Sequence, residues 1–381
     1  MYAVTDRLIK QIHASPRMAV IAVTGGGAQT LSWLLRVPGA SNTVIEAVAP
    51  YSEAALRDFL GSQPDQAVSG ETARAMARTA YRRAVRLRPD DRPVTGIACT
   101  ASIASNRPKR GDHRCHVAAW NDTRVTTYSL VLSKGLRDRS GEDTVVSMLV
   151  LKAMAASYGI DFGLSLDLVE GEEIEVEVVS YDDSLEAMLA GHVASVVVSP
   201  DGAMSADAAV GGAILSGSFD PLHAGHLELA KTAEDMLHSE ITYEISVTNV
   251  DKPPLSDQET RARTGQFKGL ATVVVTNAEV FHKKAVLFPG RTFVIGVDTA
   301  DRLVDPRYSG DSPSAMLMAL DETRRSGCSF LVAGREQNGT FRTLNDVPVP
   351  GEFAEIFSSI PEAKFRSGIS STELRLAGRK G

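Results

Sequence analysis

Short apolar runs alternate with stretches of helical periodicity along the first part of the chain. Strands are predicted at residues 18–23, 94–98 and 125–132, and helices around residues 31–35, 52–60, 71–87 and 142–157. The first of these strands runs into the glycine-rich turn Thr24–Gly27 and then into a helix. Strands and helices in alternation are typical of an α/β layer domain.

A second series of apolar runs begins at Ala213. Its predicted strands lie at residues 213–215, 241–247, 272–275, 292–295 and 329–332, with helical segments between them. Because each strand is followed by a helix, the pattern predicts a parallel, doubly wound sheet.

The segment between the two series has a different pattern. EGEEIEVEVVS alternates like an exposed strand, and SPDGAMSADAAVGG is small and polar, which is typical of a linker. The chain has 381 residues, more than a single core usually supports. We therefore predict an N-terminal domain at residues 1–162, a connecting segment at 163–210 with the boundary near residue 205, and a C-terminal domain at 211–381.

Composition narrows the classes of partner. The net charge of −7 gives no basic surface for sequence-independent nucleic-acid binding, so small anionic substrates are expected instead. The three cysteines are too few and too scattered for a disulfide framework or a zinc knuckle, and no metal-ligand cluster is expected. The longest apolar run, around residues 145–156, is interrupted by Lys152, and no secretory signal is visible. A cytoplasmic protein without a membrane partner is the expectation.

The segment SGSFDPLHAGH follows the first strand of the C-terminal series and opens a helix. His223 and His226 are spaced i and i+3, so they share one face of the first turn, where free N–H groups and the helix dipole favour a phosphate. Gly217 and Gly225 allow a triphosphate to approach the backbone closely. The alternative is that His223 caps the helix and His226 packs inside; the glycine-rich strand-to-helix context favours ligand binding.

A second polar cluster, ISSTELR, lies near the C-terminal end. Ser370 and Glu373 have the spacing of a capping box, which an ordinary helix start would explain. Such a cap does not need Ser371, Thr372 and Arg375 as well, so phosphate binding is the favoured interpretation.

Together, SGSFDPLHAGH and ISSTELR resemble the paired signatures of the nucleotidyltransferase superfamily, over roughly residues 212–378. The resemblance implies a Rossmann-like domain with His223, His226 and Arg375 as catalytic residues. His223 and His226 would bind the triphosphate and stabilise the transition state, while Arg375, with Ser370, Ser371 and Thr372, would hold its β- and γ-phosphates. It implies that Mg²⁺ accompanies the nucleotide. The nucleotide-binding residues that it implies are Ser216, Gly217, Ser218, Phe219, Gly225, Ser370, Ser371 and Thr372.

Two further segments resemble nicotinamide or nicotinate mononucleotide adenylyltransferases. IGVDTADRL is similar to their GxD segment, which implies that Gly296 and Asp298 line the nucleotide pocket. VTNVDKPPLSDQETRARTGQF is similar to their acceptor-side loop, which implies that Lys252 and Arg261 bind the acceptor. That family usually has a tryptophan shortly after GxD. This sequence has no tryptophan there, and the nearby aromatic residue is Tyr308. Without this resemblance, a site at the carboxyl edge of the sheet and a simple turn explain Asp298 equally well. Lys252 is then better explained as a solvated loop cation.

Two alternatives to adenylyl transfer stay open. RSGISST also resembles the RTxGIST signature of cytidylyltransferases that activate phospho-alcohols with CTP, in which case Arg366 would carry phosphate too. The third hypothesis is a nucleotide-sensing protein that binds ligand without turnover.

The N-terminal part resembles the C-terminal domain of CinA-type proteins, which deamidate nicotinamide mononucleotide. The likeness rests on VTGGGAQTLSWLLRVPGAS, APYSEAALRDFLG and VSGETARAMA, within about residues 5–160. Ala22 and Leu56 stand where that family carries a nucleophilic serine and a lysine, so deamidation by that route is predicted to be absent. The Thr24–Gly27 turn either holds a ribose phosphate or serves strand-to-helix geometry, the favoured alternative. The insertion ASNRPKRGDHRCH is either a basic lip or a solvated loop.

Both resemblances lead to pyridine mononucleotides. The leading prediction is therefore an adenylyltransferase that makes NAD, or its acid precursor, from ATP and the nicotinamide or nicotinate mononucleotide. The N-terminal domain would then be a scaffold, a ligand sensor or a dimerisation unit, and a homo-oligomer is compatible with this prediction.

Overall fold

The chain folds into two compact units, residues 1–182 and 183–381. The computed structural model describes residues 2–90, 92–106, 110–248, 253–337 and 340–366. Among these residues, no helix combines the length and the apolar character that crossing a bilayer requires.

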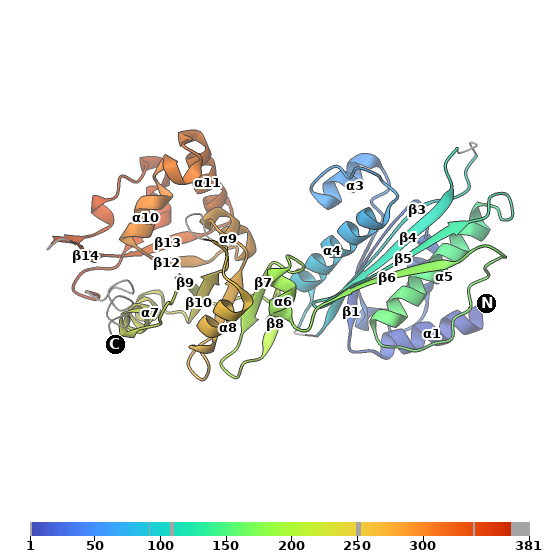
Figure 1. The fold of residues 1–381 in the computed structure, drawn as a ribbon, viewed down its shortest axis with the longest axis horizontal. Coiled ribbons are helices and arrows are strands. Elements are labelled where there is room, and N and C mark those ends of the chain that lie inside the picture. Colours follow the sequence, from blue (N-terminus) through green and yellow to red (C-terminus); the bar gives the residue numbers. More distant parts are fainter. Residues whose placement is uncertain (1, 91, 107–109, 249–252, 338–339, 367–381) are drawn as a thin grey trace. The chain divides into compact units, whose positions relative to one another are not determined.

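The first unit is a six-stranded mixed sheet in the order β2-β1-β3-β4-β5-β6. Its first three strands in this order are parallel, and each later neighbour is antiparallel. Helix α4 covers one face, and α1, α2 and α5 lie on the other (Figure 1). The elements are α1 (Tyr2–Ala14), β1 (Met18–Thr24), α2 (Ala28–Arg36), η1 (Ala40–Asn42), β2 (Val44–Val48), α3 (Glu53–Leu60), α4 (Gly70–Leu87), β3 (Val94–Ser102), β4 (His113–Trp120), β5 (Arg124–Leu132), α5 (Arg139–Ser157) and β6 (Ile174–Ser180).

Local sequence signals place these helices. The Ser69 and Asp138 side chains accept hydrogen bonds from backbone N–H groups in the first turns of α4 and α5. Gly96 lets α4 lie directly on β3, because a Cβ at this position would be 2.0 Å from the carbonyl oxygen of Ala77. The unit therefore has a continuous sheet with an apolar core on the α5 face and the buried side of α4 on the other.

The predicted insertion of the first unit is only partly a loop. Strand β4 begins at His113, because alternate residues such as Cys115 and Val117 point into the core. The His113 ring lies 2.7 Å from the buried carboxylate of Glu142. Neither alternative, a basic lip or a solvated loop, describes His113; Arg107 and Lys109 lie outside the described residues.

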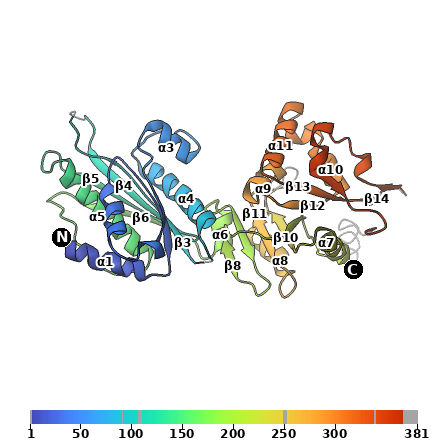
Figure 2. The ribbon, with the colours of Figure 1, turned by 180° about the vertical axis from the view of Figure 1, so that it is seen from behind.

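The second unit is an eight-stranded sheet in the order β16-β13-β12-β9-β10-β11-β7-β8. The six strands from β16 to β11 are parallel, and β7 and β8 continue the sheet in antiparallel pairing. Helices α7 and α8 lie on one face, and α9, α10 and α11 on the other (Figure 2). This confirms the predicted doubly wound sheet.

The helices of the second unit are α6 (Ser184–Leu189), α7 (Ala224–Leu237), α8 (Asp257–Gly265), α9 (Phe281–Leu287), α10 (Val297–Leu303), η2 (Pro306–Ser309), α11 (Pro313–Arg325), η3 (Leu344–Asp346) and η4 (Gly351–Ile356). Its strands are β7 (Ser195–Val198), β8 (Met204–Ala206), β9 (Ala213–Ser216), β10 (Ile241–Ser246), β11 (Val273–Thr276), β12 (Thr292–Gly296), β13 (Ser329–Ala333), β14 (Arg335–Gln337), β15 (Thr340–Arg342) and β16 (Phe357–Ser359). Strands β14 and β15 pair with each other as a separate hairpin.

The segment predicted as a connection is divided between the two units. Strand β6 extends the first sheet, whereas α6, β7 and β8 belong to the second, so the boundary falls at residues 182–183 and not near residue 205. The polar stretch after Val198 is the tight turn of the β7–β8 hairpin, in which the N–H of Gly202 donates to the carbonyl of Ser199. Small polar residues therefore mark a turn within the sheet here and not a flexible linker.

Candidate active site

The candidate site lies where the strand order of the second sheet reverses. Numbered along the chain, its parallel strands run 3-2-1-4-5-6, and β9 and β12 are the first and fourth of them. In sheets of this kind, ligands bind beyond the carboxyl ends of the strands at such a switch point. The loop after β9 carries the histidine pair, and Gly296 ends β12. The histidine loop and the predicted GxD segment therefore follow neighbouring strands, at the edge where a ligand is expected.

A buried aromatic residue shapes the loop between β9 and α7. Phe219 is fully buried, and its ring packs edge-on against His226, Tyr243 and Phe267 at centroid distances of 4.9, 5.4 and 5.4 Å. Its backbone φ of 42° is left-handed, which costs a bulky residue roughly 1–3 kcal/mol and needs compensation by packing. Gly217 makes room for this ring, since a Cβ there would lie 2.8 Å from it. Phe219 and Gly217 therefore shape the loop.

His223 and His226 stack on each other at the start of α7. Their ring centroids are 3.7 Å apart and their planes differ by 21°. His223 is the N-cap residue, and its backbone N–H donates to Nδ1 of His226 at 3.3 Å. Because Nδ1 of His226 accepts this bond, Nε2 carries the ring proton and is a hydrogen-bond donor. The pair combines both sequence interpretations: it belongs to the helix start, and it keeps N–H groups at the predicted phosphate site.

Both histidines are neutral at pH 7. Burial lowers the pKa of His223, and burial together with the neighbouring His223 lowers the pKa of His226 to about 4. They therefore act as imidazole N–H donors in the ligand-free protein and not as cations. The first turn of α7 has no acidic residue, so its backbone N–H groups favour an anion.

Two residues of α8 and its C-terminal end hold the loop, and sequence reasoning missed both. The side-chain amide of Gln266 donates to the carbonyl of Phe219 at 2.9 Å and accepts from the N–H of Leu222 at 2.8 Å. Arg263 donates to the carbonyl of Ser218 at 3.1 Å and lies 3.4 Å from a carboxylate oxygen of Asp220. A glutamine and an arginine near a helix end carry no sequence pattern that points to such a role.

Arg261 is directed away from this loop. Its guanidinium lies 2.9 Å from Asp183, the N-cap residue of α6, and 2.8 Å from Asp257. Residues two apart on a helix project about 200° from each other, so Arg263 faces the loop while Arg261 faces α6. The structure thus does not bring Arg261 to the histidine pair, and it favours a bracing role over acceptor binding. The other predicted acceptor residue, Lys252, lies outside the described residues.

Asp298 lies in the first turn of α10, two residues after Gly296. Its carboxylate accepts hydrogen bonds from Arg335 at 2.7 Å and Gln337 at 3.0 Å, both on β14. Asp301 pairs in the same way with Arg342 of β15 at 2.7 Å. The β14–β15 hairpin is therefore tied to α10, and the charge of Asp298 is already balanced in the ligand-free protein.

A buried ion pair lies behind the end of β9. Glu244 of β10 is fully buried, and its carboxylate accepts from Lys284 at 2.8 Å and from Thr276 at 2.7 Å. Ser216, the register partner of Glu244, has a buried hydroxyl oxygen with no hydrogen-bond partner among the described residues. The role of Ser216 in nucleotide binding stays a prediction. The sequence pattern predicted only a strand around Glu244 and a helix around Lys284, and it gave no sign that the two residues pair.

The remaining predicted residues have three outcomes. Ser218 and Gly225 belong to the loop and to the first turn of α7, as expected. Arg366, the residue that the cytidylyltransferase alternative would use, pairs with Glu336 and Glu362 at 3.5 and 3.2 Å. The predicted triphosphate residues Ser370, Ser371, Thr372 and Arg375 lie outside the described residues.

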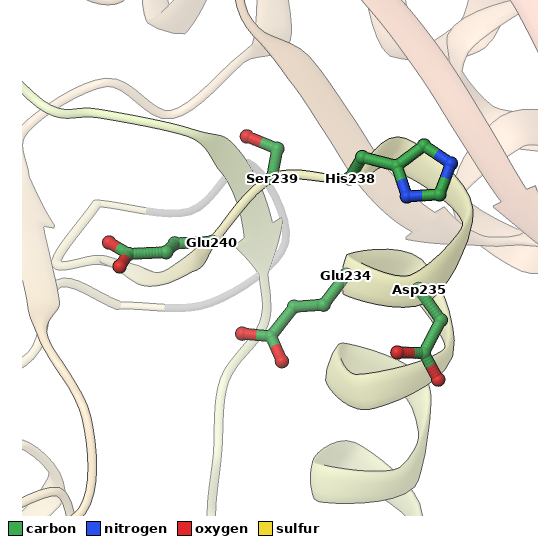
Figure 3. A pocket seen from close by; sticks show the side chains of 5 residues that line it. All are labelled: Glu234, Asp235, His238, Ser239 and Glu240. Atoms are coloured by element: carbon green, nitrogen blue, oxygen red, sulfur yellow. The ribbon is translucent and has the colours of Figure 1, made fainter.

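A separate cavity of about 510 Å³ opens at the other end of α7 (Figure 3). Its lining residues are Glu234, Asp235, His238, Ser239 and Glu240. Helix α7 has 14 residues, so this cavity is about 20 Å from the histidine pair. Three carboxylates would also repel a triphosphate, so the cavity is not part of the candidate active site.

Comparison with known proteins adds a family for the second unit and similar folds for the first. Residues 214–377 match the model of a family described as cytidylyltransferase-like. No curated protein sequence matches the chain. Solved structures of CinA-type proteins are similar to its N-terminal part. The competence/damage-inducible protein CihA from Agrobacterium tumefaciens is 22% identical, over 41% of this chain and 92% of that one, with a TM-score of 0.33. A CinA superfamily protein from Escherichia coli is 20% identical, over 40% and 85% of the two chains, with a TM-score of 0.31.

The family match and the histidine site fall on the same domain. The predicted resemblance to the nucleotidyltransferase superfamily is thereby confirmed, whereas the resemblance to adenylyltransferases of pyridine mononucleotides stays a prediction, as does the loss of the N-terminal serine and lysine. Residues 214–377 of this chain form a cytidylyltransferase-like domain of the nucleotidyltransferase superfamily.

Proposed function

We propose that the second unit transfers an adenylyl group from ATP to nicotinamide or nicotinate mononucleotide, with release of pyrophosphate. The observation that carries this proposal is the stacked pair of neutral histidines at the start of α7, at the switch point of the sheet. Nucleotidyl transfer needs donors that are fixed before charge develops, and this pair is held by Phe219 and by the helix backbone.

The reaction needs no covalent intermediate with the enzyme. An oxygen of the acceptor phosphate attacks the α-phosphorus of the triphosphate, and the bond from this phosphorus to the bridging oxygen breaks, so that pyrophosphate leaves with the electron pair. Nε2–H of His226 donates to oxygens on which negative charge grows, and the N–H groups of the first turn of α7 assist. Because His226 is neutral and already oriented, it stabilises this charge without a proton transfer.

Magnesium is expected to enter with the nucleotide. Bound Mg²⁺ would neutralise charge on the β- and γ-phosphates. Among the residues that the structure describes, no group of three or more histidine, cysteine or carboxylate side chains is placed to hold a metal ion. The donor set at the loop, made of N–H groups and one serine hydroxyl, fits the phosphates better than the ion. The residues of this chain would therefore bind the triphosphate, and the triphosphate would hold most of the Mg²⁺ coordination.

The choice of acceptor rests on resemblance and on the fusion of two domains that both point to pyridine mononucleotides. IGVDTADRL supplies the GxD segment at the end of β12, and Arg263 supplies a cation at the loop. A second candidate keeps the same chemistry with CTP and a phospho-alcohol, and the similarity of RSGISST to the RTxGIST signature favours it.

The test is pyrophosphate release by the full chain with Mg²⁺, in which ATP and CTP are each combined with nicotinamide mononucleotide, nicotinate mononucleotide and phosphocholine. Loss of one preorganised donor lowers turnover by about 10²–10³-fold, so His226→Ala should do so. His238→Asn is the matched control, since it changes an exposed histidine at the other end of α7 and asparagine tolerates the left-handed backbone there.

Each result selects one hypothesis. Turnover with ATP and a pyridine mononucleotide that depends on His226 supports the leading proposal. Turnover only with CTP and phosphocholine replaces it with the second candidate. Nucleotide binding without turnover in any pair would favour the nucleotide-sensing alternative.

A further inference from the structure

The first unit has a cavity of about 570 Å³ beyond the carboxyl end of β1. Its wall includes the glycine-rich turn, Tyr51, Asp138, Arg139 and Asp143. Cavities of this size accommodate small organic ligands. The charges in the wall therefore indicate which class of ligand it accepts.

An internal carboxylate occupies the glycine-rich turn. The N–H of Gly27, which precedes α2, donates to the carboxylate of Asp143 at 2.7 Å. A phosphate oxygen bound at the turn would need this N–H and would meet the negative charge of Asp143. Gly25 is explained by packing alone, since its φ is 77° and a Cβ would lie 1.8 Å from the carbonyl oxygen of Ala101. Strand-to-helix geometry accounts for the turn, and a ribose phosphate does not fit it.

Arg139 does not offset this repulsion, because its guanidinium is directed at the wall. It donates to the carbonyl of Ala104 at 2.8 Å, to the carbonyl of Gly25 at 3.3 Å and to the hydroxyl of Tyr51 at 3.2 Å. The last contact holds Tyr51 at the rim of the cavity, where 67% of the residue is exposed. An aromatic ring fixed by its hydroxyl and otherwise open is a stacking surface.

We propose that this cavity binds a small cation that carries an aromatic ring and excludes phosphate monoesters. The ligand stacks on Tyr51, whose ring face attracts a cation, and the carboxylates of Asp138 and Asp143 outnumber the single guanidinium of Arg139. The proposal is independent of nucleotidyl transfer, since it concerns residues of the first unit alone.

The test uses the full chain and three probes with one aromatic ring each: benzyltrimethylammonium, benzyl alcohol and phenyl phosphate. Ligand-observed NMR gives their dissociation constants for the wild-type protein and for Tyr51→Ala, with Tyr51→Phe as the control that keeps the ring. We expect benzyltrimethylammonium to bind most tightly and Tyr51→Ala to weaken it about two- to fivefold, the range of an exposed cation–π contact. Phenyl phosphate could also bind to the second unit. Such binding is distinguished from binding in the cavity because Tyr51→Ala leaves it unchanged.

Asp143→Asn provides the second arm, because it removes the charge and keeps the shape. We expect this variant to bind benzyltrimethylammonium more weakly and to gain a Tyr51-dependent affinity for phenyl phosphate. Tyr51-dependent binding of phenyl phosphate to the wild-type protein would overturn the proposal, and so would binding of the cation that Tyr51→Ala leaves unchanged. Both of these results come from probes on folded wild-type protein and from an exposed side chain, so they do not depend on how Asp143→Asn folds.

Discussion

The two hydrogen bonds of Gln266 to the loop before α7 give a prediction with a magnitude. Gln266→Ala leaves the carbonyl of Phe219 and the N–H of Leu222 without these partners at 2.9 and 2.8 Å. Each neutral hydrogen bond contributes about 0.5–1.5 kcal/mol net, so the loop should lose about 1–3 kcal/mol. Because Phe219 carries a left-handed backbone, this loss should appear first as local opening of the loop and not as global unfolding.

Hydrogen exchange of the Leu222 amide measures this opening directly. A loss of about 1–3 kcal/mol corresponds to exchange faster by about 5- to 150-fold. Gln258→Ala is the control, since Gln258 is exposed on the same helix and its removal should change stability by less than about 0.5 kcal/mol. Turnover in the pyrophosphate assay should fall by about tenfold or more in Gln266→Ala, because the position of His226 depends on the conformation of the loop that precedes it.

A conservative variant separates the two bonds. Gln266→Glu keeps an acceptor for the N–H of Leu222 and places a carboxylate oxygen against the carbonyl of Phe219. We expect the amide of Leu222 to stay protected while the end of the loop at Phe219 loosens. Unchanged exchange at Leu222 in Gln266→Ala, with the same turnover as Gln258→Ala, would refute the assignment of Gln266 as the residue that positions the loop.

Three further predictions concern stability and packing. The pKa of His226 is about 4 in the folded protein and 6.5 when unperturbed, so the unfolded state binds more protons between these pH values. The free energy of unfolding should therefore fall by up to about 3 kcal/mol as the pH drops from 6.5 to 4, and urea titrations of His226→Asn should show a smaller fall. Lys284→Met should destabilise by about 3–5 kcal/mol in urea unfolding because it strands the buried Glu244, and adding Glu244→Gln should restore part of the loss, a result that a purely steric effect would not give. Gly217→Ala should cost about 1–3 kcal/mol and lower turnover, since its Cβ would collide with Phe219; wild-type thermal stability in this variant would contradict the loop geometry.

Periodicity was enough to predict the architecture of both units. The predicted strands at residues 213–215, 292–295 and 329–332 each fall within β9, β12 and β13, because central parallel strands are apolar on both faces and are bounded by turns. The edges were harder to predict. Strands β7 and β8 are short and border a polar, glycine-containing stretch, so only the pairing of β7 with β11 and of β8 with β7 distinguishes them from a linker.

The candidate site was predictable where the reactive side chains and the strand-to-helix turn that positions them belong to the same short sequence motif. His223 and His226 follow a strand and open a helix, and the structure stacks them there. Arg261 and Arg263 show the limit: both are basic residues on one helix, and only the packing of α8 decides which of them faces the loop. A sequence motif identifies a loop, whereas the residues that support it from another element are found only once the fold is known.

The antiparallel addition at the edge of the second sheet affects how this unit can be isolated. Strand β7 pairs along β11, and the side-chain amide of Asn277 donates to the carbonyl of Met188 in α6 at 2.6 Å. A truncated chain beginning at residue 211 would leave the apolar strand β11 with an open edge, a surface prone to self-association. A chain beginning at residue 183 keeps α6, β7 and β8, so expression of the transferase-like unit alone should give monodisperse protein only from this earlier start.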